Sequence, residues 1–402
     1  MLGAFTRASR NVPLPLLPRI LVLTALHFSA VAIMLLSGRW LQEMGGSESV
    51  LGWFSASVVP GIMLGAPLAG RLASRVAERT LIAAGLTVVA ATSLAFAATA
   101  EIGGWLVPLR FAHGIGHGIV FAGLFGLAAH HVPDRHKSQG IAHVALTAQL
   151  GNVAGVALAE WLALRAGFPL AFTGAAALAM IGTICAWRLL PDSLSEQSHA
   201  ARAAEGDHLL TPTRAQVVLC IAFFCVLGGS YGTVLQMLPL IVHRVAAQSG
   251  EPGIASPVLA TIFLAVAVCR LLFARHADGR HRRPLLISVM AVMVAATLMW
   301  PYAQSIRQLM IVAVFFAIGY GLLFPGINAL VLGSLGSRWR SRASGWMVMA
   351  YDGGFFGLLL ILGPIAERCG YAFMFALLAT LQLAGGMLFY RMARQINPRS
   401  AA

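Results

Sequence analysis

The stretch GIGHGIVF runs from Gly114 to Phe121, and the similar stretch IGYGLLF runs from Ile318 to Phe324. One isoleucine, two glycines and one phenylalanine recur between them at a spacing of 203 residues. The loops that follow, around Ser138 and Ser341, keep this spacing, and a third pair of loops differs by 204 residues. A spacing of 203 or 204 residues that recurs at three places indicates a chain built from two similar halves.

Both stretches lie in long apolar segments, and the whole chain of 402 residues is apolar. Its residues are 58% hydrophobic and 10% charged, with a mean hydropathy of +0.80, whereas soluble domains average about 25% charged residues. This composition excludes a secreted or cytosolic enzyme. Because about 20 residues cross a bilayer, the sequence predicts an all-α integral membrane protein with twelve transmembrane helices in two pseudosymmetric six-helix bundles. The apolar segments lie at 17–41, 50–72, 80–99, 104–129, 138–164, 168–190, 214–242, 255–276, 284–303, 307–335, 343–366 and 371–394.

A polar stretch from Pro191 to Thr213 separates the sixth apolar segment from the seventh. We therefore expect an N-terminal six-helix bundle at 1–190, a cytoplasmic linker at 191–213 and a C-terminal six-helix bundle at 214–402. Of the 28 lysines and arginines, 21 fall in the chain ends, the linker and the loops on one side of the membrane, and five on the other side. Because cytoplasmic loops are enriched in basic residues, both termini are predicted to be cytoplasmic, in what we expect to be a bacterial inner membrane.

The net charge of +14 is explained by this topology and does not indicate a nucleic-acid partner. Lys137 is the only lysine, and the sequence contains no Gly-Lys-Ser/Thr, so it predicts no ATP-binding P-loop. The five cysteines have no C-x-x-C spacing and predict neither a disulfide framework nor a zinc site. The expected partners are the lipid bilayer, protons and a small-molecule substrate, with no cofactor and with a monomer as the functional unit.

The loop after the second apolar segment reads GRLASRVAER from Gly70 to Arg79. It resembles the pattern Gly-x-Leu-Ala-Asp-Arg-x-Gly-Arg-Arg of the major facilitator superfamily, with serine at the acidic position. The corresponding loop of the second half reads ADGRHRR from Ala277 to Arg283 and keeps the acid. The resemblance covers essentially the whole chain and implies a cytoplasmic gate in which a carboxylate faces a helix N-terminus. The predicted gate residues are Asp278, Arg282, Arg283, Arg75 and Arg79.

The fourth apolar segment carries Arg110, His113, Gly114, Gly116 and Gly118. This series resembles the Arg-x-x-Gln-Gly-x-Gly pattern of proton-coupled drug and metabolite exporters in the same superfamily, with His113 at the glutamine position. The Gly-Pro pair that is usual in the fifth helix of these exporters is replaced here by GNVAG. The resemblance implies a secondary active transporter that exports a small organic solute in exchange for protons.

Charged side chains inside apolar segments are costly and are often functional. Arg110, His113 and His117 lie within two helical turns and project to one side of a helix. Asp352 lies about nine residues into the eleventh segment, close to the middle of the bilayer at about 1.5 Å per residue. A lone carboxylate there can exchange protons, so Asp352 and Arg110 are the predicted proton-coupling residues. Structural roles stay open: Arg110 bonded to backbone carbonyls, or Asp352 paired with Arg110 or Arg270.

Further polar residues inside the apolar segments predict the lining of a substrate cavity. The spacing of His113 and His117 suits two metal ligands, but no carboxylate or cysteine lies nearby in the sequence, so no metal site is predicted. At the 203-residue spacing, Gln149 is the counterpart of Asp352, and Tyr320 is the counterpart of His117. The predicted cavity residues are His113, His117, Gln149, Tyr320, His27 and Gln236.

Three other functions fit parts of this pattern. Uptake by proton symport would use the same membrane carboxylate. A transport-dead receptor or scaffold would normally signal through a soluble domain, and the longest polar stretch here is the 191–213 linker. A membrane-embedded enzyme ranks last, because the apolar segments contain neither paired carboxylates nor a nucleophile and base set.

Overall fold

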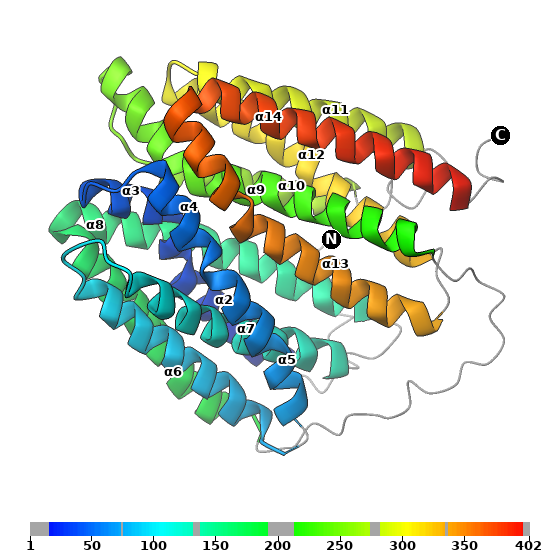
Figure 1. Cartoon of the computed structure of the whole chain (residues 1–402). Helices are drawn as coiled ribbons and strands as arrows, with labels where there is room; N and C mark the ends of the chain where they lie inside the picture. Colours follow the sequence, from blue (N-terminus) through cyan, green and yellow to red (C-terminus); the bar gives the residue numbers. More distant parts are fainter. Residues whose placement is uncertain are drawn as a thin grey trace. The chain divides into compact units, whose positions relative to one another are not determined.

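The computed structural model describes residues 16–73, 75–131, 137–191, 213–273, 282–333 and 337–396, and the secondary structure within these ranges is helical (Figure 1). The helices of the first half are α2 (Leu16–Val31), η2 (Ala32–Leu36), α3 (Ser37–Glu43), α4 (Glu48–Ala56), α5 (Val58–Leu72), α6 (Glu78–Ala97), α7 (Leu106–His131) and α8 (Lys137–Leu189). Those of the second half are α9 (Arg214–Ser249), α10 (Ser256–Phe273), α11 (Arg282–Met299), η6 (Trp300–Tyr302), α12 (Ile306–Gly333), α13 (Ser337–Gly357) and α14 (Leu359–Ile396).

Nine helical stretches among the described residues are long and apolar enough to cross a membrane. Two of them, 142–189 and 345–391, contain a glycine with positive φ: Gly167 at 79° and Gly370 at 81°. Because glycine adopts a positive φ without steric cost, each of these stretches bends into two successive helices. Together with the shorter apolar helix at 256–272, the described helices are consistent with the twelve predicted spans.

Large apolar side chains lie exposed along these helices. Val218, Leu271 and Ile361 expose 62%, 65% and 61% of their surface. Soluble monomers rarely expose apolar patches of this kind, whereas helices that contact lipid do so along their length. The chain is therefore an integral multi-pass membrane protein.

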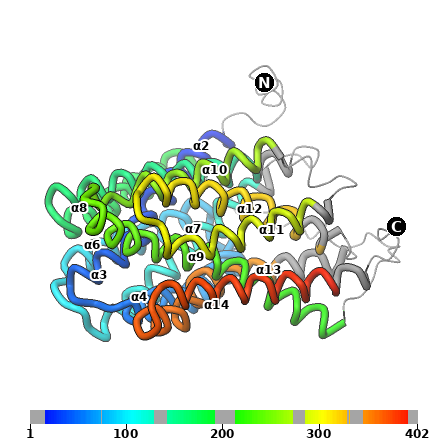
Figure 2. The backbone as a smooth tube through the Cα atoms, turned by 90° about the horizontal axis from the view of Figure 1, so that it is seen from above, coloured from blue at the N-terminus to red at the C-terminus, as the bar shows by residue number. Residues whose placement is uncertain are grey.

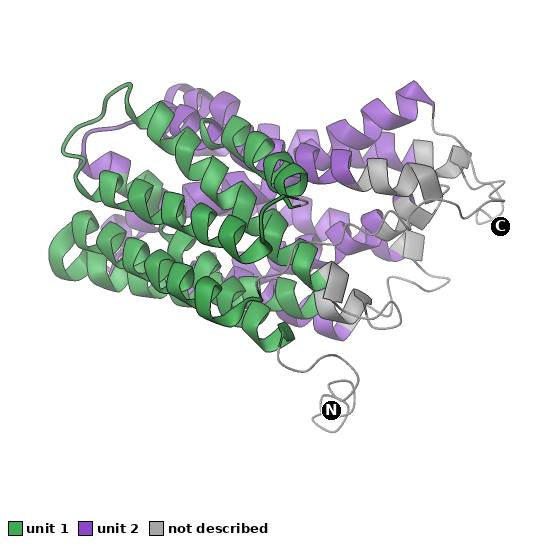
Figure 3. Cartoon of the chain, turned by 90° about the horizontal axis from the view of Figure 1, so that it is seen from below, with its two compact units in different colours: residues 1–40, 57–198 green, residues 41–56, 199–402 purple. Residues whose placement is uncertain are grey.

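Unit 1 of the structure consists of residues 1–40 and 57–198 (Figure 3). Within it, α5 packs against α7, α6 packs against α7 and α8, and α2 packs against α8. Leu23 of α2, Ile82 of α6 and Leu124 of α7 are fully buried in the core that these helices share. The unit is thus a bundle held together by apolar faces of its own helices.

Unit 2 consists of residues 41–56 and 199–402. It contains α9 to α14, with α12 beside α10 and α11 (Figure 2), and with α9 packed against α13 and α14. It also contains α4, which packs against α14 and α13. The predicted boundaries assign 41–56 to the N-terminal bundle, and the division at the 191–213 linker stays a prediction.

Each unit contains a pair of closely packed helices at the 203-residue spacing. In unit 1, a Cβ atom on Gly151 of α8 would lie 2.9 Å from the carbonyl oxygen of Ala25 of α2. In unit 2, Gly354 of α13 lies against the backbone of Cys225 of α9, and Gly228 of α9 lies against the backbone of α13. Gly354 and Gly228 follow Gly151 and Ala25 by 203 residues. The sequence repeat is therefore also a repeat of glycine-mediated helix packing.

Candidate functional site

Polar side chains of α2 and α7 meet inside unit 1 in a histidine cluster, which consists of His27, His113, His117 and Arg110. Nε2 of His27 and Nδ1 of His117 lie 2.9 Å apart, so one nitrogen donates a hydrogen bond to the other. Their rings stack with centroids 5.0 Å apart and planes inclined by 17°. His27 is completely buried. The pair therefore joins α2 to α7 through one hydrogen bond inside the bundle.

His113 is bonded to Thr92 of α6, with 3.0 Å between Nδ1 and Oγ1. The hydroxyl of Thr92 has a single hydrogen, which it donates to the carbonyl oxygen of Val88 across 2.8 Å. When Thr92 donates in this way, its oxygen can only accept from His113, and Nδ1 of His113 then carries the hydrogen. Nε2 of the neutral ring is then the nitrogen that is able to accept a hydrogen bond or a proton.

Arg110 completes the histidine cluster at the start of α7. Its side chain is 3% exposed, and it lies on the helix face of His113 and His117, three and seven residues away. The cluster thus combines a permanent cation with three rings that become cationic on protonation. Among the described residues, no group of three His, Cys, Asp or Glu side chains is arranged to hold a metal ion.

Two glycines of α7, Gly116 and Gly118, pack closely against neighbouring helices. A Cβ atom on Gly118 would lie 2.9 Å from the carbonyl oxygen of Ile62 of α5, and one on Gly116 would lie 2.7 Å from that of Gly85 of α6. A side chain at either position would push these helices apart. The glycine series that resembles the exporter pattern is therefore required for packing, whichever direction the substrate moves.

Unit 2 contains a tyrosine cluster, which consists of Tyr231 of α9, Tyr320 of α12 and Tyr351 of α13. The rings of Tyr231 and Tyr320 stack with centroids 3.8 Å apart and planes inclined by 2°. The hydroxyls of Tyr320 and Tyr351 form a hydrogen bond. The guanidinium carbon of Arg270 lies 5.9 Å from the ring centre of Tyr320 and 5.8 Å from that of Phe324, within cation–π range.

Asp352 directly follows Tyr351 in α13 and is half-buried. No ion pair with Asp352 is found among the side chains of unit 2 that the structure describes. Arg270, one of its two expected partners, lies over the aromatic rings of Tyr320 and Phe324 instead. The part of unit 2 that the structure describes therefore gives no support to a structural ion pair between Arg270 and Asp352.

The two glutamines of the predicted cavity have different surroundings. Gln149 of α8 is half-buried, and its Oε1 has no hydrogen-bond partner among the described residues. Gln236 of α9 is 2% exposed and donates to the carbonyl oxygen of Phe355 across 2.9 Å, while it accepts from the hydroxyl of Ser55. Gln149 is thus the glutamine that keeps hydrogen-bonding capacity, and Gln236 links α9 to α4 and α13.

The predicted gate lies only in part within the described residues, and Asp278 lies outside them. Two gate arginines are the first residues of α11 (Arg282–Met299). Arg75 is exposed after the end of α5, and the guanidinium carbon of Arg79 lies 5.1 Å from the ring centre of Trp187. The gate therefore stays a prediction.

An acidic residue that sequence reasoning missed is Glu160 of α8. It is 1% exposed, and its Oε1 lies 3.7 Å from Nη1 of Arg39, so the two charges form an ion pair inside unit 1. The signal in the sequence was an acid inside the fifth apolar segment. Its pairing with a basic residue favours a structural role over proton exchange.

Two contacts of α4 were not predicted either. The hydroxyl of Tyr371 donates to Oε1 of Glu48 across 2.7 Å, and the backbone N–H of Ser49 donates to Oε2 of Glu367 across 3.2 Å. The partners are 323 and 318 residues apart in the chain. Both contacts lie in unit 2, and they fix the start of α4 to α14.

The sequence profile described as the Major Facilitator Superfamily matches residues 19–358. No curated protein matches the sequence. Among solved structures, the nucleoside transporter NupG has a TM-score of 0.73 at 14% identity, over 94% of this chain and 98% of that one. A bacterial homolog of the human lysosomal transporter Spinster has 0.70 at 13% identity, over 96% and 97%. The human organic anion transporter MFSD10 has 0.64 at 15% identity, over 93% and 99%.

Proposed function

Because the chain belongs to the Major Facilitator Superfamily, we propose that it is a secondary active transporter that moves a small organic solute by alternating access and couples this movement to protons. The observation that carries the proposal is the placement of Asp352. Its carboxyl group is half-buried in an apolar helix, and no ion pair with it is found in the described part of unit 2. Because a charge inside the membrane is costly, such a residue is by default a functional one.

The tyrosine cluster supports a coupling role for Asp352. Tyr351 precedes Asp352 in α13, and its hydroxyl is bonded to Tyr320 of α12. A change of charge on the carboxyl therefore takes place next to a hydrogen bond between two membrane helices. We propose that gain and loss of this proton alter the contact between α12 and α13, and that Arg110 in unit 1 is energetically coupled to the same step.

The histidine cluster supports a role in substrate recognition. His27, His113 and His117 are held by defined hydrogen bonds, to each other or to Thr92. In the tautomer of His113 with its hydrogen on Nδ1, Nε2 is an acceptor, and Arg110 contributes donors on the same helix face. We propose that these groups, with Gln149, bind polar atoms of the solute. Tyr320 and Gln236 have other hydrogen-bond partners in the described structure, so their predicted contact with the solute requires that they exchange these partners.

We propose export as the direction of transport, on the resemblance of α7 to proton-coupled exporters. Uptake is the second candidate. Gly116 and Gly118 have a packing role that is independent of direction, and this weakens the argument for export. The similar fold of the nucleoside transporter NupG supports transport without deciding the direction.

Solute counterflow into proteoliposomes tests whether the chain transports at all, because counterflow requires neither a driving ion nor a known direction. The panel contains nucleosides, organic anions and cationic drugs, and empty liposomes are the control. Exchange of at least one solute supports the proposal. If the folded protein exchanges none of these solutes, the result supports the hypothesis of a receptor or scaffold that does not transport. A deletion strain then gives the direction, since an exported solute accumulates inside the cells.

A further inference from the structure

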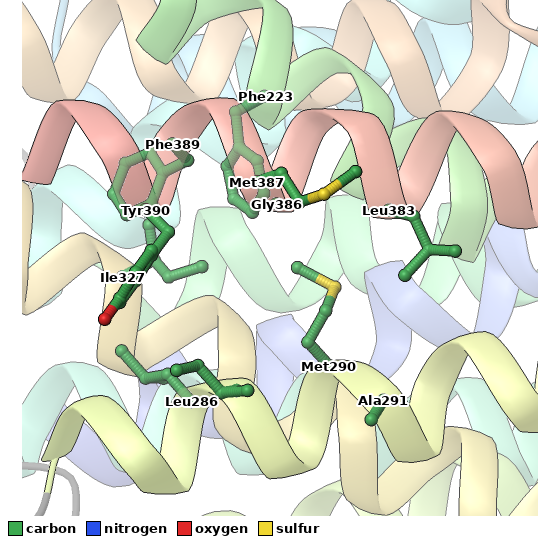
Figure 4. Close-up of a pocket in the computed structure, with 11 residues that line it drawn as sticks. Phe223, Leu286, Met290, Ala291, Ile327, Leu383, Gly386, Met387, Phe389 and Tyr390 are labelled. Atoms are coloured by element: carbon green, nitrogen blue, oxygen red, sulfur yellow. The ribbon is translucent and has the colours of Figure 1, made fainter.

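An apolar groove with a volume of about 270 Å³ lies in unit 2 between α11 and α14 (Figure 4). The rings of Phe223 and Phe389, with centroids 4.8 Å apart, form its floor together with Ile327. All three floor residues are buried. Met290 projects from α11 toward α14, and Leu383 projects from α14 toward α11 (Figure 4). The groove is thus a hollow bounded by two helices and closed below by packed rings.

The edges of the groove are exposed. Ile287, Leu383 and Met387 expose 52%, 45% and 58% of their surface. They belong to stretches that are apolar enough to cross the membrane, at 285–302 and 345–391. In a bilayer, such a surface is covered by lipid. Because an empty gap forfeits dispersion contacts, a flexible hydrocarbon chain gains contacts by entering the groove.

One end of the groove is basic. Leu286 and Tyr390 lie at this end, whereas Ala291 and Leu383 lie at the other (Figure 4), so α11 and α14 run antiparallel along it. The exposed Arg391 of α14 directly follows Tyr390 and therefore lies toward this end, where α11 also begins. Basic residues next to a membrane helix attract anionic lipid headgroups.

We propose that the groove binds one acyl chain of an anionic phospholipid, whose phosphate lies at the end marked by Arg391. The apolar lining accounts for the acyl chain, and the exposed Arg391 accounts for the negative headgroup. The site differs from both polar clusters, because it contains neither histidines nor the stacked tyrosines. It does not depend on the direction of transport or on the driving ion.

Photocrosslinking in vesicles tests this proposal with the full-length protein. The probe is phosphatidylglycerol that carries a diazirine in one acyl chain, and phosphatidylcholine with the same acyl chain is the neutral probe. Peptide mapping should place the phosphatidylglycerol adducts on residues 286–291 and 383–390 in preference to other lipid-facing helices. Even labelling of all lipid-facing peptides, or equal labelling by both probes, would contradict the proposal.

Two variants separate the chain site from the headgroup site. A Cβ atom on Gly386 would lie 2.9 Å from Cε of Met290, the flexible end of a side chain, so Gly386→Leu fills the groove and should abolish the adducts there. Ala384→Leu is the matched control, since Ala384 is exposed on α14 outside the groove lining. Arg391→Gln leaves the groove open and should lower the preference for phosphatidylglycerol about fivefold.

Each variant decides its own part of the proposal. Adducts that persist in Gly386→Leu contradict the acyl-chain site, provided that this variant unfolds at the same temperature as Ala384→Leu. If Gly386→Leu does not fold, the positions of the adducts on the native protein decide the acyl-chain site, and Arg391→Gln decides the headgroup site. An unchanged lipid preference in Arg391→Gln contradicts the headgroup site.

Discussion

His27 and His117 face each other through one nitrogen each, Nε2 and Nδ1, at a distance of 2.9 Å. A hydrogen bond between them requires that one of the two nitrogens carries no hydrogen. If both rings are protonated, both facing nitrogens become donors, and the contact between α2 and α7 is lost. The pair therefore tolerates one added proton and separates on the second.

The first prediction concerns the stability of this pair. His117→Phe keeps a ring in place but leaves the nitrogen of buried His27 without its partner, which should cost about 1–3 kcal/mol of unfolding free energy. His27→Phe should cost a similar amount. The double variant should recover part of the loss, because no polar atom is then left without a partner. Denaturation in detergent micelles measures all three, and purely additive losses would contradict the pairing.

The second prediction concerns the contact of α4 with α14. Tyr371→Phe removes the hydroxyl that donates to Glu48, and it should lower the unfolding free energy by about 1 kcal/mol. It should also speed the labelling of a cysteine introduced at Ser49, because the start of α4 is held less firmly. Tyr302→Phe is the control, since Tyr302 is 65% exposed. Equal labelling rates in both variants would show that the hydroxyl does not hold α4.

The third prediction concerns close helix packing in unit 2. A Cβ atom on Gly232 of α9 would clash with the backbone carbonyl of Phe355 of α13. Gly232→Ala should therefore destabilise the protein by about 1–3 kcal/mol. Gly126→Ala in α7 meets nothing within 4 Å and should be neutral or stabilising by up to about 1 kcal/mol. Thermal unfolding compares the two, and equal effects would contradict the packing.

The helices and their repeat could be predicted because the signals are local. Apolar runs of about 20 residues mark spans, and Ile115 and Ile318 show the 203-residue spacing directly. The structure adds that the same spacing relates the helix contacts of Gly151 and Gly354. The fold class could therefore be predicted from the sequence alone, and the structure confirms it.

The hydrogen-bond partners of polar side chains could not be predicted from the sequence. The sequence predicts that His113 lines a cavity, and in the structure its Nδ1 bonds to Thr92 on another helix. The sequence also predicts that Gln236 lines this cavity, and in the structure it links α9 to α4 and α13. Such contacts depend on how each helix is rotated about its axis, which hydropathy does not determine. The roles of these residues in the candidate site stay predictions.

The fourth prediction concerns topology. Cys369 is exposed next to the bend at Gly370, whereas Cys220 and Cys269 are buried. With cytoplasmic termini, the connection between the eleventh and twelfth spans is expected outside. A membrane-impermeant maleimide should therefore label intact cells, and Cys369→Ser should remove this label. Labelling of Cys369 only in inverted vesicles would overturn the predicted orientation.

The central claim is that Asp352 carries the coupling proton, and accumulation driven by a pH gradient tests it most directly. Proteoliposomes with native protein, Asp352→Asn or Asp352→Glu receive the same gradient and the solute identified by counterflow. Asp352→Asn keeps the size of the side chain and loses the titrating group, so it should exchange the solute without accumulating it, whereas Asp352→Glu should retain accumulation. Undiminished accumulation in Asp352→Asn would contradict the account.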